Sequence, residues 1–166
     1  MPSAAGVIDW LAVLVLLAAL FSAALSDASS YIIPNRYPAA IAVAFLFFAI
    51  GKPLAFLLTG LAVGVGTLMF GAALFARGTL GGGDVKLLAA TALWASLDRL
   101  PLLLFATAIG GGVLALAQLS PLHRLLPARP GASAATDFRG RMRQPVPFGI
   151  AIALGGVCIA LSRVAS

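Results

Sequence analysis

Six apolar runs separated by short polar segments constrain this chain more than any other feature. They lie at residues 7–25, 38–50, 53–76, 84–97, 102–119 and 146–161. A helix needs about 20 apolar residues to cross the hydrocarbon core of a bilayer. Charged residues make up only 10% of the chain, against roughly 25% in a typical soluble protein. We therefore predict an all-α polytopic integral membrane protein with about six transmembrane helices, which excludes a soluble enzyme, a coiled coil and a disordered chain.

The charge and the cysteine content narrow the class of function further. The net charge of +6 comes from 11 Lys and Arg residues against 5 acidic ones. In a membrane protein such an excess sets orientation, so we expect the lipid bilayer and no nucleic acid as a partner. Cys158 is the single cysteine, which excludes an intrachain disulfide and a cysteine-rich zinc site. We predict no metal and no cofactor.

The distribution of cations between the connecting segments predicts the orientation. Cytoplasmic loops of membrane proteins carry an excess of Lys and Arg. Eight cations fall on one side and three on the other: Arg36, Arg77, Lys86, Arg124, Arg129, Arg139, Arg141 and Arg143 against Lys52, Arg99 and Arg163. The first side is thus predicted to be cytoplasmic, with both termini on the opposite side. This arrangement also brings Asp27 and Asp84 to the cytoplasmic face.

Two aspartates at one membrane face can carry general acid–base chemistry on a water molecule. Two carboxyl groups that share a site hold one proton between them, so that one accepts a proton from water while the other donates to a carbonyl oxygen. Each aspartate also has a simpler interpretation. Asp84 follows three glycines and is a suitable N-cap for a helix. Asp27 is suited to be a hydrated carboxylate in the loop after the first span.

Three motifs carry a resemblance to a known family. Residues 81–88, GGGDVKLL, resemble the GxGDxKL signature of the type IV prepilin peptidases, which are membrane aspartic proteases. Residues 27–35, DASSYIIPN, are similar to that family's first motif, an Asp followed by Ile-Pro-Asn. Residues 146–149, VPFG, resemble the family's entry to its last helix. The three motifs occur in the order that the family has.

The resemblance implies an activity, a location and partners. It implies an aspartic endopeptidase that removes the N-terminal leader of prepilins, with Asp27 and Asp84 as the catalytic pair. The enzyme would be a multi-pass protein of the inner membrane, with its active site facing the cytoplasm. The chain lacks the zinc-binding cysteine insertion of longer members and resembles the compact TadV/CpaA-like members, which serve Flp pili. We therefore expect residues 1–166 to form a single transmembrane peptidase domain without a separate soluble or zinc-binding domain, and pilus assembly machinery as a further partner.

Seven other residues are candidates for substrate access or positioning: Pro34, Asn35, Gly81, Gly83, Lys86, Pro147 and Gly149. Glycines before Asp84 would let a substrate backbone come close. Lys86 faces away from Asp84 on a helix and is suited either to an anionic group or to reaching the membrane interface. Pro34 and Asn35 are expected to shape the turn between the first two helices. Gly149 would let the last helix approach the acids.

Two readings from other functional classes remain open at this point. Acidic residues within membrane spans are common in transporters, so a small proton- or cation-coupled membrane transporter is one alternative. A non-catalytic pilus assembly subunit is another. An archaeal-type preflagellin peptidase, or a different GxGD protease, would differ only in the substrate.

Overall fold

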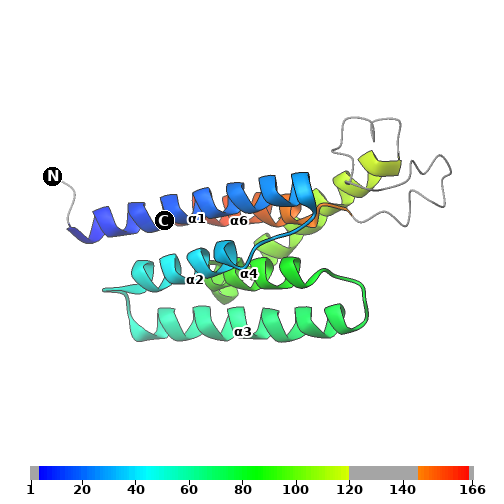
Figure 1. Ribbon diagram of the computed structural model, residues 1–166. Helices are drawn as coiled ribbons and strands as arrows, with labels where there is room; N and C mark the ends of the chain where they lie inside the picture. Colours follow the sequence, from blue (N-terminus) through cyan, green and yellow to red (C-terminus); the bar gives the residue numbers. More distant parts are fainter. Residues whose placement is uncertain (1–3, 120–145, 165–166) are drawn as a thin grey trace.

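The computed structural model describes residues 4–119 and 146–164 (Figure 1). Its five helices are α1 (Ala4–Ser30), α2 (Arg36–Ala49), α3 (Leu54–Ala76), α4 (Gly82–Leu119) and α6 (Phe148–Val164). The described residues contain no strand, which confirms the all-α prediction. Five of the arginines that predict the orientation, Arg124, Arg129, Arg139, Arg141 and Arg143, lie outside the described residues.

Three of these helices are long and apolar enough to cross a membrane. They are residues Gly6–Ser30 of α1, Leu54–Ala76 of α3 and Gly82–Ala117 of α4. The apolar stretches Arg36–Ala49 and Phe148–Arg163 are shorter. The chain is therefore an integral membrane protein with several apolar helices, while the number of six transmembrane helices stays a prediction.

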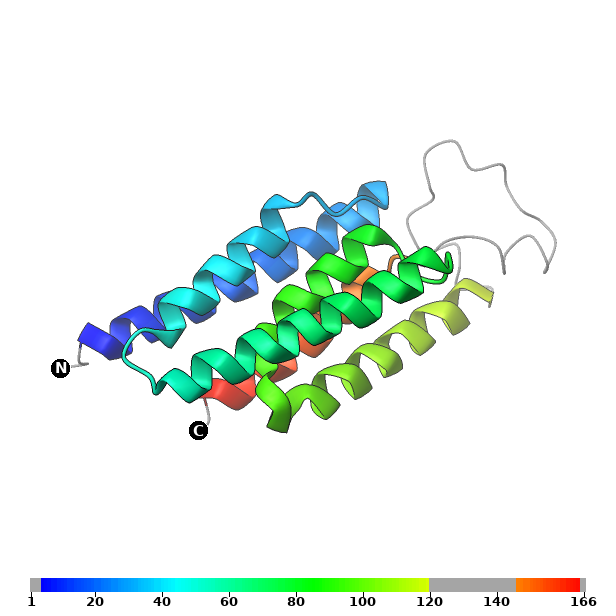
Figure 2. The ribbon, with the colours of Figure 1, turned by 90° about the horizontal axis from the view of Figure 1, so that it is seen from below.

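The helices lie side by side and alternate in direction, so that each end of the bundle gathers segments from distant parts of the sequence (Figures 1 and 2). At one end α1 and α3 finish, and α4 and α6 begin. We call this the aspartate end, because Asp27 and Asp84 lie in these helix ends. At the opposite end α1 begins, α2 leads into α3, and α6 finishes. Helix α4 packs against α6, α3 and α2.

Helix α4 contains a reversal of the chain at Ser96, which Figure 2 shows as two arms running in opposite directions. Ser96 has φ 53° and ψ −172°, which no helical residue adopts. The sequence predicted a connector at residues 98–101, and this was wrong: the second arm is already helical there. Pro101 lies inside this arm, five residues after the break at Ser96.

Arg163, near the end of α6, holds this reversal in place. Its Nε and Nη2 donate to the carbonyl of Trp94 at 3.0 and 2.9 Å, and Nη2 also donates to Ser96 Oγ at 2.8 Å. A helix leaves its last carbonyls without partners in the helix, and a cation at its C-terminus satisfies them and complements the helix dipole. The guanidinium therefore stabilises the end of the first arm and the strained residue after it.

We expect Arg163→Gln to lower the free energy of unfolding by about 2 kcal/mol, because hydrogen bonds from a charged donor are lost at a buried helix end. The measurement is reversible unfolding in mixed micelles. Arg77→Gln is the matched control, since Arg77 is exposed at the C-cap of α3. Equal stability of the two variants would contradict the role given to Arg163.

Helix α1 extends further than the apolar run that predicted it. The run ends at residue 25, but the helix continues to Ser30. The residues of this last stretch are polar, and their serine side chains hydrogen-bond to backbone carbonyls of the same helix. Ser29 Oγ donates to the carbonyl of Leu25 at 2.8 Å, and Ser30 Oγ donates to that of Ser26 at 2.7 Å. The extension places Asp27 within the last turn of a helix and not in the following loop.

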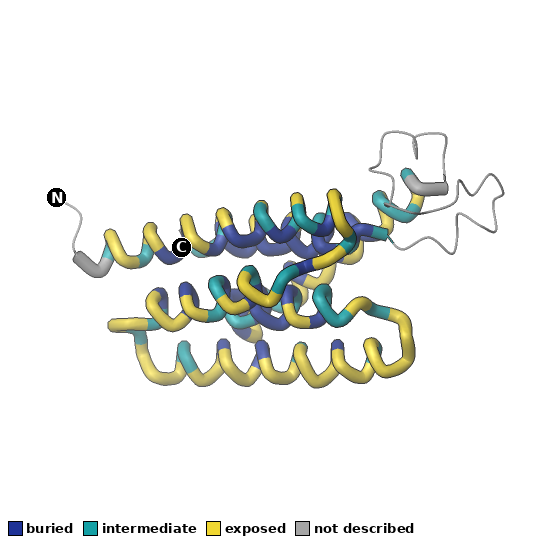
Figure 3. Tube along the Cα trace, in the orientation of Figure 1, coloured by how far each residue is buried: buried dark blue, intermediate teal, exposed yellow. Residues whose placement is uncertain are grey.

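Burial is concentrated on the surfaces of α1, α2, α4 and α6 that face the interior of the bundle (Figure 3). Trp94, Leu16 and Ile152 are fully buried there. Helix α3 is mostly exposed although it is apolar, with Met69 and Phe70 among its exposed side chains. An apolar exposed surface of this kind fits a lipid environment.

Candidate active site

Asp27 is buried at the aspartate end, with only 5% of its surface exposed. The backbone N–H of Gly149 donates to Asp27 Oδ2 at 2.7 Å. This bond joins the last turn of α1 to the first turn of α6, across 122 residues of sequence. The interpretation of Asp27 as a hydrated loop carboxylate is therefore wrong: the carboxyl group is held inside the bundle and oriented by a backbone donor.

The contact between α6 and Asp27 requires a glycine at position 149. A Cβ atom there would lie 2.8 Å from Asp27 Oδ2 and 3.0 Å from Asp27 Cβ. Pro147, just before it, is fully buried, and its carbonyl accepts the Ile150 N–H at 3.3 Å. The sequence motif at residues 146–149 thus turns the chain into α6 directly against Asp27.

Asp84 lies in the first turn of α4 and is partly buried. The Gly81 backbone N–H hydrogen-bonds to the Asp84 carboxyl group, and the Gly81 carbonyl accepts the N–H of Val85 at 3.1 Å. In a capping box, the side chain at the third helical position accepts a hydrogen bond from the backbone N–H of the N-cap residue. Asp84 therefore serves the start of α4, but from within its first turn and not as the N-cap residue.

The glycines before Asp84 leave room for two neighbouring groups. A Cβ atom on Gly81 would lie 2.7 Å from Asp84 Oδ2, and one on Gly83 would lie 3.1 Å from the Cβ of Ile33. Side chains at these positions would displace either the carboxylate or the segment between α1 and α2. The neighbours of these glycines are thus Asp84 and Ile33 of this chain, and the access of a substrate backbone at Gly81 and Gly83 stays a prediction.

Ile33 connects the two halves of the site, and reasoning from the sequence did not single it out. The side chain is buried, and its Cδ1 would lie 3.0 Å from a Cβ atom on Gly149, while its Cβ faces Gly83. It therefore packs between the glycine beside Asp27 and the glycine before Asp84. Asp27 and Asp84 thus lie on either side of Ile33, at the same end of the bundle. The signal in the sequence was an isoleucine within the first motif, 27–35.

Lys86 and Asn35 join the starts of α4 and α2 at the protein surface. Lys86 Nζ donates to Asn35 Oδ1 at 2.9 Å, and both residues are exposed. Pro34 accepts the N–H of Tyr37 at 3.2 Å and Asn35 accepts that of Ala39 at 3.1 Å, so these two residues form the entry to α2. Lys86 thus links the start of α4 to the start of α2 through the amide oxygen of Asn35.

Tyr31 is a further feature of the site that the sequence did not reveal. It has φ 55°, a left-handed conformation that is rare for residues other than glycine, and its N–H donates to the carbonyl of Asp27 at 2.9 Å. Tyr31 follows the last residue of α1, four positions after Asp27, and leads the chain towards Ile33. Among residues 4–119 and 146–164 no three His, Cys, Asp or Glu side chains come together as ligands of a metal ion would.

The segment that contains both aspartates matches a known protein family. Residues 14–116 match the model of the type IV leader peptidase family. This segment is more than half of the chain, contains Asp27 and Asp84, and ends before α6. Comparisons with curated proteins and with solved structures gave no match. The chain therefore belongs to the type IV leader peptidase family, and it is a prepilin peptidase, an aspartic protease that acts on prepilins.

Proposed function

We propose that Asp27 and Asp84 are the catalytic pair, and that the substrate is a Flp-type prepilin whose leader is cut at the cytoplasmic membrane face. One observation supports the proposal: the end of α1 and the start of α4 place two carboxyl groups, Asp27 and Asp84, at the same end of the bundle, and Ile33 packs against the glycine beside each of them. Two such groups, held by backbone donors from Gly149 and Gly81, are the minimum that water activation by an aspartic protease needs.

The chemistry follows from one proton shared by two carboxyl groups. The ionised carboxylate takes a proton from a water molecule as its oxygen attacks the scissile carbonyl carbon, and the protonated carboxyl donates to the carbonyl oxygen. The tetrahedral intermediate then collapses: the C–N bond breaks as the protonated carboxyl gives its proton to the nitrogen, and a hydroxyl of the intermediate gives a proton to the ionised carboxylate. The leader leaves with a new carboxyl group, which ionises in water. The carboxyl groups end with one proton between them, as they began.

The position of the pair at a helix end suits a substrate whose hydrophobic helix stays in the bilayer. A prepilin of this kind has a basic leader followed by an apolar helix. The apolar helix would lie against the exposed apolar surface of the enzyme, and the bond before it would reach the aspartate end. Pro34, Asn35, Gly81, Gly83, Lys86, Pro147 and Gly149 are proposed to position the acids and the leader around that bond.

The orientation and the domain organisation belong to the same proposal. The sequence predicts eight cations on the side of Asp27 and Asp84, and this predicted excess supports a cytoplasmic active site in the inner membrane. We propose that residues 1–166 act as a single transmembrane peptidase domain, and that pilus assembly machinery receives the processed pilin.

The experiment that tests the substrate class uses the purified chain in lipid vesicles with a Flp-type prepilin, and mass spectrometry of the products. A single cut between the basic leader and the apolar helix is the expected result. The matched control is a prepilin of another type IV class with the same length of apolar helix. Equal cleavage of both would contradict the Flp preference, and cleavage of the control alone would assign the enzyme to another pilus class.

A further inference from the structure

Ile33 is an apolar residue at the centre of the site that the chemistry above does not use. In the segment 31–35, which links α1 to α2, it is the only buried residue, with 8% of its surface exposed. The residue before it, Ile32, is 65% exposed. One of two adjacent isoleucines therefore points into the bundle although it belongs to no helix.

The Ile33 side chain reaches from the surroundings of one aspartate to those of the other. On the Asp27 side, its Cδ1 would lie 3.0 Å from a Cβ atom on Gly149, whose N–H donates to Asp27. On the Asp84 side, its Cβ and Cγ1 would lie 3.1 and 3.6 Å from a Cβ atom on Gly83. Gly83 directly precedes Asp84, so the two ends of one side chain meet the neighbours of both acids.

Hydrogen bonds hold the segment around Ile33 to both of the helices that carry the acids. Ser26 Oγ, in α1, donates to the carbonyl of Ile32 at 2.8 Å. Lys86 Nζ, in α4, donates to Asn35 Oδ1 at 2.9 Å. Ile33 lies between these two attachments, so its position is fixed relative to the end of α1 and to the start of α4.

A buried isoleucine suits the task of separating two catalytic groups. Its branched Cβ restricts the side chain to few rotamers, and close packing leaves little room for movement. It also carries no donor or acceptor that would compete for the carboxyl groups. Two acids that act on one peptide bond have to be held within about 0.5 Å of their productive positions. A stiff apolar spacer meets this requirement.

We propose that Ile33 is a positioning residue of the peptidase reaction. It holds the end of α1 and the start of α4 at the separation at which both carboxyl groups act on the same peptide bond. The proposal rests on Asp27 and Asp84 being the catalytic pair. Because Ile33 is buried, it acts through the two acids and not through contact with the prepilin. A shorter side chain should therefore lower kcat and leave KM unchanged.

The test measures kcat and KM for prepilin cleavage at equal amounts of folded protein. Ile33→Val removes only Cδ1, and Ile33→Ala removes every side-chain atom beyond Cβ. We expect kcat to fall about threefold and about tenfold, on a scale where a displacement of 1 Å costs roughly 10²-fold, with KM changed less than twofold. Ile159→Val is the matched control, since it removes the same carbon from a fully buried isoleucine ten residues after Gly149 in α6. It should lower stability as much as Ile33→Val and leave kcat unchanged.

A double variant separates this role from a general effect on packing. The methyl group added by Gly149→Ala would meet Ile33 Cδ1, and Ile33→Val removes that atom. The losses of the two single variants should therefore not multiply, because residues in contact give effects that are not additive. Losses that multiply would mean that Ile33 does not act through Gly149 and Asp27, and would overturn the proposal.

The remaining outcomes distinguish this proposal from the one on which it rests. If Ile33→Val and Ile33→Ala keep full kcat while Asp27→Asn and Asp84→Asn abolish cleavage, the catalytic pair stands and the role of Ile33 is wrong. A rise in KM at unchanged kcat would place Ile33 in contact with the prepilin, and would also overturn it. Cleavage that survives an aspartate substitution would overturn the catalytic pair, and this role of Ile33 with it. Ile33→Val alone decides the matter if Ile33→Ala does not fold.

Discussion

Asp27→Asn and Asp84→Asn are each expected to lower kcat for leader cleavage by at least about 10³-fold, because each removes one of the two proton-transfer groups. The measurement is the rate of prepilin cleavage by purified variants that reach the membrane at the level of the unsubstituted chain. Asp98→Asn is the matched control. The Asp98 side chain is 64% exposed, and it pairs with Arg99 away from the aspartate end. Its removal should change kcat less than twofold.

The double variant Asp27→Asn/Asp84→Asn adds a sharper expectation. Residues that act as one unit give losses that do not multiply, since the second substitution removes nothing that still works. The kcat of the double variant should therefore be no lower than that of the less active single variant. Two independent losses that multiply would mean that the carboxyl groups contribute separately, and a single variant that keeps its activity would remove that residue from the catalytic pair.

Gly149→Ala has the second largest expected effect. The added Cβ would lie 2.8 Å from Asp27 Oδ2 and 3.0 Å from the Ile33 side chain, so Asp27 or the start of α6 has to move. Displacing a catalytic group by about 1 Å can cost roughly 10²-fold in rate. We expect kcat to fall by about that factor. The readout is the same cleavage rate, compared at equal amounts of folded protein.

Gly112→Ala is the control for this substitution. A Cβ atom on Gly112 would meet nothing within 4 Å, although the residue lies in a glycine-rich stretch of α4. It should keep full activity and full stability. If Gly112→Ala lowered the rate as far as Gly149→Ala, the loss would reflect glycine in membrane helices generally, and not the contact of Gly149 with Asp27.

Much of the fold could be predicted because apolar runs report directly on helices in a membrane protein. The beginning of α3 after Pro53 and its end at Ala76 were both predicted correctly. The strict alternation of the runs also predicted that Asp27 and Asp84 lie at the same end of the bundle, as they do. This part of the argument needs only the order of the runs, and it is insensitive to errors of a few residues in their bounds.

The remaining features depend on contacts between distant segments. The break in α4 falls at Ser96, ahead of the charged segment 98–101, because Arg163 from α6 binds the carbonyls that the break exposes. The extension of α1 depends on serine side chains that bond to the backbone. Ile33 gains its place from two glycines that lie 50 or more residues away in the sequence. None of these contacts between distant residues can be predicted from the hydropathy of the sequence.

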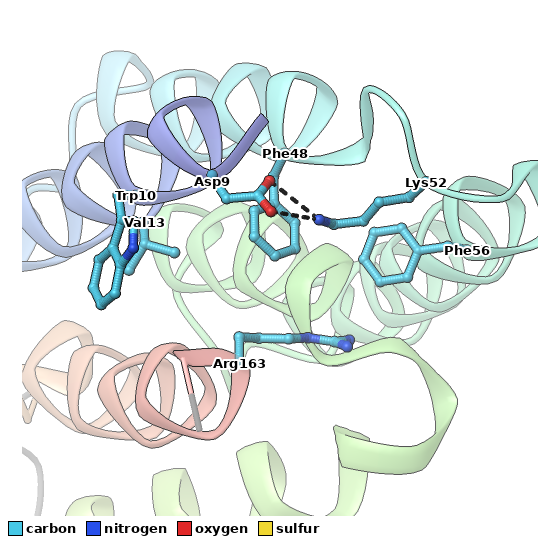
Figure 4. A pocket seen from close by; sticks show the side chains of 8 residues that line it. Asp9, Trp10, Val13, Phe48, Lys52, Phe56 and Arg163 are labelled. Atoms are coloured by element: carbon cyan, nitrogen blue, oxygen red, sulfur yellow. Dashed lines mark hydrogen bonds and ion pairs between the residues drawn. The ribbon is translucent and has the colours of Figure 1, made fainter. Parts of the chain in front are cut away.

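The opposite end of the bundle shows the same limit, because residues from distant parts of the sequence line one pocket there (Figure 4). The sequence indicates Lys52 only as one of the cations that predict the orientation, and it does not pair Lys52 with Asp9. The structure joins the first helix to the segment between α2 and α3 through the Asp9–Lys52 ion pair and adds Arg163 from the last helix. Three charges that seemed independent in the sequence thus lie around one pocket.

The most direct test of the central claim is the N-terminal sequence of a Flp-type prepilin co-expressed with the unsubstituted chain, with Asp27→Asn and with Asp84→Asn. The account predicts that the unsubstituted chain yields a pilin that begins directly before its apolar helix, and that both variants, present in the membrane at normal levels, leave the leader attached. Processed pilin with either variant would contradict the catalytic pair. Unprocessed pilin with all three, together with proton or cation flux that Asp84→Asn abolishes, would favour a transporter instead.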